Sequence, residues 1–71
     1  MTESQKQWAI GRLIVACEST VIGAQDMIYA IGGEPETRSQ LGEIWAQLSE
    51  LAEVHRTKWD RARKLEEKAT V

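Results

Sequence analysis

Apolar residues recur through residues 8–31 at the three- and four-residue spacings of a helix. Only Arg12, Glu18 and Asp26 place charge in that stretch. A second segment, residues 36–69, is rich in Glu, Lys, Arg, Leu, Ala and Gln, which are good helix formers, and contains one glycine and no proline. The pattern therefore predicts two long helices and no strand.

The sequence GGEPE at residues 32–36 separates the two segments. Two glycines suit a left-handed helix C-cap, and Pro35 suits the first turn of a new helix. At the amino end, Thr2 and Gln5 have the spacing of a capping box. We expect one all-α domain over residues 1–71, an antiparallel hairpin with a helix at about 3–31, a hinge at 32–35 and a helix at about 35–69.

The second helix carries one apolar stripe at heptad spacing. A neighbouring row holds Trp45, Ala52 and Trp59, and the remaining faces are charged, so this helix requires about one buried side. The stripe consists of Leu41, Ile44, Leu48, Leu51, His55, Lys58, Ala62, Leu65 and Ala69.

The first helix is apolar or small over more than half of its circumference, whereas a surface helix usually shows an apolar stripe of about 100°. One partner helix cannot cover that width, so we expect the hairpin to dimerise into a four-helix bundle. Small residues at strict heptad spacing favour a tight seam between two copies of this helix, although they also suit positions beneath larger neighbours. The predicted dimer interface is Ala9, Leu13, Ala16, Thr20, Gly23, Met27 and Ala30.

A further apolar row on the first helix, Trp8, Val15, Ile22 and Tyr29, has polar rows on both sides. We call this row the ridge. Aromatic residues are favoured anchors in protein interfaces, so the ridge is a candidate partner-binding strip. The alternative is that the ridge is packed within the dimer or beneath the second helix.

Antiparallel pairing about a hinge near residue 33 brings Trp8 opposite Trp59, with His55 one turn away. This open-end cluster is a candidate aromatic pocket, or else it closes the end of a short bundle. No nucleophile with an oriented base, and no acid–base pair, is apparent around His55. We therefore expect no enzymatic activity and no catalytic residue.

Cys17 is the only cysteine, which excludes an internal disulfide and fits a reducing compartment. One Cys and one His cannot supply four zinc ligands, and no cofactor motif is present, so we expect neither metal nor cofactor. No uncharged run in the first helix exceeds seven residues, and the amino terminus lacks the basic region of a signal peptide. These features predict a cytoplasmic protein without a membrane partner.

Charge is unevenly distributed, although the formal net charge is only −2. Residues 1–54 carry three basic and eight acidic side chains, whereas residues 55–71 carry six basic and three acidic ones. The basic segment is a candidate nucleic-acid contact, or else a solvated helix end whose charges favour the helix dipole. Its candidate residues are Arg56, Lys58, Arg61, Arg63 and Lys64.

These features favour a non-enzymatic homodimer that binds a larger protein and inhibits or modulates it. Small helical accessory proteins of phage or bacterial type act in this way on transcription regulators, nucleases or motor ATPases. Two alternatives remain open at this stage. One is an RNA- or DNA-binding regulator that uses the basic tails of the dimer, and the other is a structural subunit of a larger assembly.

Overall fold

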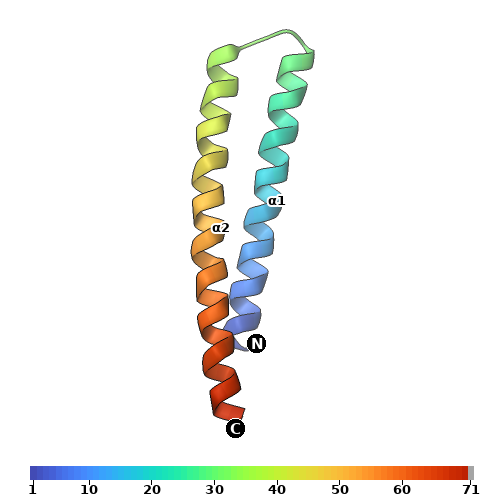
Figure 1. Cartoon of the computed structure of the whole chain (residues 1–71). Coiled ribbons are helices and arrows are strands. Elements are labelled where there is room, and N and C mark those ends of the chain that lie inside the picture. Colours follow the sequence, from blue (N-terminus) through green and yellow to red (C-terminus); the bar gives the residue numbers. More distant parts are fainter. Residues whose placement is uncertain (71) are drawn as a thin grey trace.

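The computed structural model describes residues 1–70 and shows two helices, α1 (Glu3–Ala30) and α2 (Pro35–Thr70), with no strand in that range. The helices run side by side in opposite directions, so that both termini lie at the same end (Figure 1). The predicted all-α, two-helix hairpin is confirmed, and each helix ends within one residue of its expected limit.

The first turn of α1 is fixed by the predicted capping box. The Thr2 hydroxyl accepts a hydrogen bond from the backbone N–H of Gln5 at 3.2 Å, and the Thr2 backbone N–H donates to Oε1 of Gln5 at 2.9 Å. Both bonds satisfy donors that have no partner within the helix. The start of α1 is therefore encoded locally.

The hinge begins with a glycine C-cap. Gly32 has a φ of +84°, its N–H donates to the carbonyl of Tyr29 at 3.0 Å, and the N–H of Gly33 donates to the carbonyl of Ile28 at 3.2 Å. This pair of bonds is a Schellman motif, which ends a helix and reverses the chain. Glu34 then opens α2, because its carbonyl accepts the N–H of Arg38 at 3.0 Å.

The side of α1 that faces α2 is defined by residues spaced alternately three and four apart, all buried or half-buried. This alternation is the heptad pattern of a helix packed along a partner. Five of its eight members are polar or lack a side chain, which is unusual for such a row. We call this set the inner row: Ser4, Gln7, Gly11, Ile14, Glu18, Val21, Gln25 and Ile28.

The α2 stripe predicted from its apolar residues is only partly the packing surface. Ile44, Leu51 and Leu65 remain 45%, 45% and 62% exposed, and Lys58 and Ala69 are also exposed. The helix is instead rotated toward the neighbouring row. The half-buried or buried residues of α2 are Arg38, Leu41, Gly42, Leu48, Ser49, Ala52, His55, Trp59, Ala62 and Glu66.

This rotation follows from polar contacts, which the spacing of apolar residues does not reveal. His55 and Glu66 both bond to the inner row of α1, and the small residues Ser49 and Ala52 are half-buried on the same side of α2. Buried polar groups require partners, so these bonds set the rotation of α2. Ile44 and Leu51 are turned outward as a result.

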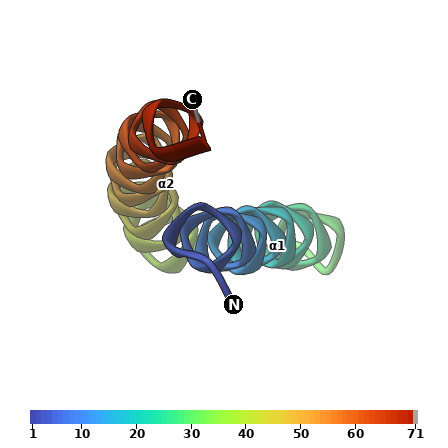
Figure 2. The same cartoon turned by 90° about the horizontal axis from the view of Figure 1, so that it is seen from below.

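The hairpin alone encloses almost no apolar core. Within the described part of the chain, only Ile14 and Ala62 are buried hydrophobic residues. The molecule is a rod of 58 × 16 × 11 Å, and the view along it shows two helix axes inclined to each other with no third layer (Figure 2). Its accessible surface is 5642 Å², whereas a compact 8.0 kDa monomer exposes about 4,450 Å².

Replacing Gly32 with Ala is expected to lower the free energy of unfolding by about 1–2 kcal/mol, because a β-carbon disfavours the left-handed backbone at this position. Gly33→Ala is the matched control, since Gly33 has no positive φ and a β-carbon added there would meet open space. Denaturation followed by circular dichroism at equal protomer concentration measures both. Equal losses in the two variants would contradict the assigned cap.

Candidate interaction surfaces

The ridge on α1 is exposed along its whole length. Trp8, Val15, Ile22 and Tyr29 retain 58%, 44%, 44% and 69% of their accessible surface. These residues directly follow the inner-row residues Gln7, Ile14, Val21 and Ile28, so the ridge borders one side of the helix–helix interface. The hairpin therefore leaves the ridge free, and α2 does not cover it.

A groove of about 540 Å³ lies between α2 and the amino-terminal half of the ridge, Trp8 and Val15. Its floor is formed by residues with little or no side chain, Gly11, Ser49 and Ala52, and Val15 forms part of the α1 wall. The polar side chains Arg12, Glu18, Glu53 and Arg56 line its edges. An apolar floor with charged edges on both helices is a surface that can hold one face of an amphipathic helix.

The open end of the hairpin brings together Trp8, His55 and Trp59, which all line the groove. Trp8 is more than half exposed and also borders a second hollow of about 500 Å³ on the side of Ser4, while Trp59 is half-buried. Arg12 lies over the Trp8 ring at 5.7 Å and Arg63 over the Trp59 ring at 5.2 Å. In the single hairpin the two Trp side chains thus line open hollows.

His55 takes part in a chain of hydrogen bonds across the interface. Nε2 of the buried Gln7 donates to Oε1 of Glu3 at 2.9 Å, so Gln7 Oε1 is the acceptor for Nδ1 of His55 at 2.6 Å. His55 must therefore carry its proton on Nδ1 in this arrangement. The imidazole is held by a structural bond that fixes the distance between α1 and α2.

Near the hinge, Gln25 provides the equivalent contact. Its Nε2 donates to the backbone carbonyl of Arg38 at 2.9 Å, and a β-carbon on Gly42 would lie only 3.3 Å from the same nitrogen. The Arg38 guanidinium lies over the ring of Tyr29 at 4.7 Å. Gly42 thus provides room for a side chain that ties the hinge ends of the helices together.

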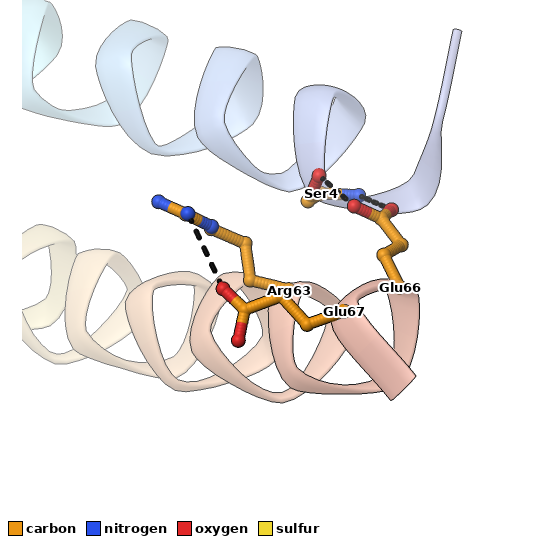
Figure 3. A network of polar contacts seen from close by, with 4 residues as sticks. All are labelled: Ser4, Arg63, Glu66 and Glu67. Atoms are coloured by element: carbon orange, nitrogen blue, oxygen red, sulfur yellow. Dashed lines mark hydrogen bonds and ion pairs between the residues drawn. The ribbon is translucent and has the colours of Figure 1, made fainter. Parts of the chain in front are cut away.

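At the open end, the Glu66 carboxylate of α2 caps the start of α1 (Figure 3). It accepts the Ser4 backbone N–H at 3.1 Å and the Ser4 hydroxyl at 2.7 Å. A carboxylate near a helix amino terminus also interacts favourably with the helix dipole. These Ser4 bonds, the largest contributions, lower the pKa of Glu66, with a smaller contribution from the positive charge of Arg63.

The basic residues of α2 are dispersed and largely paired. Arg56 lies 3.9 Å from Glu53, Arg63 lies 3.4 Å from Glu67, and Lys64 lies 3.1 Å from Asp60. Lys58 and Arg61 complete the predicted set. At about 100° per residue, the five project along four different rows of the helix, so they form no single basic stripe.

The predicted dimer-interface residues lie on the side of α1 opposite α2. Leu13 and Met27 are 68% and 71% exposed, Ala16, Thr20, Gly23 and Ala30 are also exposed, and Ala9 is half-buried. Cys17, a free thiol, is exposed beside them. We call the seven predicted residues the outer face of α1. The row of Arg12, which itself lines the groove, lies between the outer face and the ridge.

By length and composition alone, α1 could cross a membrane, although its uncharged runs are short. One such helix near an amino terminus is weak evidence, because a central helix of a bundle passes the same test. Among residues 1–70, no group of three or more His, Cys, Asp or Glu side chains is placed to hold a metal ion.

Comparison of this chain with family models, curated proteins and solved structures gives no match. The interpretation of these surfaces therefore depends on their geometry alone.

Two features of the interface were not predicted from the sequence, the Ser4–Glu66 cap and the Gln7–His55 bond. The available signal was the three–four spacing of the inner row, which continues through polar positions. A search restricted to apolar residues does not detect this spacing, because Ser4, Gln7 and Gln25 are polar.

Glu66→Gln is expected to lessen the loss of stability in acid. The pKa of Glu66 in the folded protein is lowered from its ordinary 4.5. Its contribution to the free energy of unfolding is therefore complete above the unfolded-state pKa and is lost as pH falls through the folded-state pKa. Glu67→Gln is the control, since Glu67 pairs with Arg63 on the exposed surface. Unfolding measured between pH 7 and pH 3 should show a shallower decline only for Glu66→Gln, and identical profiles would contradict the cap.

Proposed function

We propose that this chain is a non-enzymatic helical interaction protein, which acts as a homodimer and binds a larger protein partner to inhibit or modulate it. The observation that carries the proposal is the exposed ridge of Trp8, Val15, Ile22 and Tyr29, whose amino-terminal half borders a groove lined by charged side chains. Aromatic residues in such a position are the side chains that dominate binding energy in protein interfaces.

The hairpin offers two apolar surfaces on different sides of α1. The ridge and groove occupy one side, and the outer face, with Leu13 and Met27, lies away from them. A protein that uses one surface for its own dimer keeps the other for a partner. This division supports a four-helix bundle that presents one ridge on each copy.

The geometry of the groove favours a helix as the bound element. Ridge residues recur every seven positions, about 10.5 Å along the axis, which matches the repeat of an apolar stripe on a second helix. Groove edges carrying Arg12, Glu18, Glu53 and Arg56 would orient that helix by charge.

Membrane association through α1 is a second candidate, favoured by the length and apolar composition of that helix. Nucleic-acid binding receives less support, because three of the five candidate basic residues already pair with acidic neighbours on α2. Phosphate binding requires several basic groups free to displace counterions.

Truncating the ridge should abolish capture of a protein partner. In the variant Ile22→Ser/Tyr29→Ser we expect at least about a 30-fold loss of affinity, since interface aromatics contribute 2 kcal/mol or more. Binding is measured against nuclease-treated lysate of the native host, followed by titration of the recovered protein. Helicity and oligomeric state should stay unchanged, because both side chains are already exposed.

The control variant is Arg61→Glu/Arg63→Glu/Lys64→Glu, which should retain partner binding because exposed ion pairs contribute about 0–1 kcal/mol each. The opposite result, binding lost in the control variant and a steep fall with salt, would indicate nucleic acid. Unfolding of Ile22→Ser/Tyr29→Ser would show that the ridge is core and would overturn the site.

A further inference from the structure

The outer face of α1 is an apolar surface that α2 leaves uncovered. Leu13 and Met27 are 68% and 71% exposed on the side of α1 away from α2. The neighbouring row adds Ile31, 83% exposed, and across the hairpin α2 adds Ile44 and Leu51. Such an extent of exposed large side chains marks an interface.

The accessible surface area of the hairpin indicates how much surface a partner should bury. The hairpin exposes about 1,200 Å² more than a compact monomer of 8.0 kDa would. A specific protein interface buries about 800 Å² on each partner. The excess is therefore larger than the area that one copy loses in a standard-sized dimer interface, so one such interface fits within it.

Charge identifies a second copy as a suitable occupant and also sets its direction. The hinge half, residues 18–47, holds one Arg and five carboxylates, a net charge of −4. The open half, residues 1–17 with 48–71, holds eight basic and six acidic groups, a net charge of +2. Antiparallel copies place opposite charges side by side, whereas parallel copies place like charges together.

From these observations we infer that a second copy of this chain covers the outer face, with the two α1 helices antiparallel about a two-fold axis near residues 19 and 20. The inference rests on the homodimer of the proposed function and specifies its geometry. Residues whose numbers sum to about 39 then lie opposite one another.

This register pairs small residues with small residues. Ala9 lies opposite Ala30 of the second copy, and Ala16 lies opposite Gly23 of the second copy, so the backbones can approach closely. Arg12 and Asp26, both exposed and on one row beside the outer face, then lie within one residue of each other across the axis. The two-fold axis forms this ion pair twice.

Disulfide trapping tests the direction. In a Cys17→Ser background, Ala9→Cys and Ala30→Cys are made separately and then mixed under mild oxidation. Antiparallel pairing places the two copies of residue 9 about 31 Å apart, far beyond the 7 Å between α-carbons that a disulfide allows. We expect crosslinked dimer only in the mixture, at no less than half of the chains.

A crosslink in Ala9→Cys alone would show parallel helices and overturn the inference. A dimer by light scattering that crosslinks in neither the single variants nor the mixture would assign the interface to another face and would also overturn it. A monomer near 8 kDa at micromolar concentration, particularly one that sediments with phosphatidylcholine vesicles, would show that no second copy covers α1.

Charge reversal provides an independent measurement. Arg12→Asp and Asp26→Arg should each raise the dimer Kd about 5-fold or more, since each reversal acts twice across the axis. The double variant Arg12→Asp/Asp26→Arg should return to within about twofold of the native Kd. Additive losses in the double variant would contradict the pairing.

Partner capture by the crosslinked dimer is measured separately. Loss of capture with an intact crosslink would refute the ridge as the partner-binding site and leave the dimer geometry in place.

Discussion

The composition of the interface between α1 and α2 is the constraint on which the rest of the structure depends. The inner row places Ser4, Gln7, Gly11 and Gln25 where most helical hairpins place leucine or isoleucine. Ser4, Gln7 and Gln25 bond across the interface, to Glu66, His55 and the Arg38 carbonyl respectively. The internal interface is therefore specified by hydrogen bonds, and most apolar side chains remain available for other surfaces.

Local features of the fold were predicted correctly because they depend on short stretches of sequence. The capping box of Thr2 and Gln5 and the glycine C-cap at Gly32 each need only a few neighbouring residues. The packing side of α2 was predicted only in part, because it also depends on residues 48 and 62 positions apart in the chain. The predicted stripe was right for its buried or half-buried members, such as Leu48 and Ala62. It was wrong for Ile44, Leu51 and Leu65, since apolar spacing contains no information about the polar partners on α1.

The candidate surfaces also divide into those that one stretch of sequence defines and those that depend on both helices. The sequence located the ridge and the outer face as rows on α1, and the structure leaves both exposed. It did not indicate the groove, because the groove exists where Gly11 of α1 meets Ser49 and Ala52 of α2. Small residues leave no periodic apolar signal, yet where they line both helices they leave room for the hollow beside the ridge.

The seven-residue spacing of the ridge has a consequence for the shape of anything that binds it. An α-helix has 3.6 residues per turn, so a strict heptad row drifts about 20° around a straight helix with each repeat. Trp8 and Tyr29 are three repeats apart, which amounts to about 60°. The ridge is thus a shallow left-handed stripe, and a segment that follows it from end to end must wind around α1 as one strand of a left-handed supercoil.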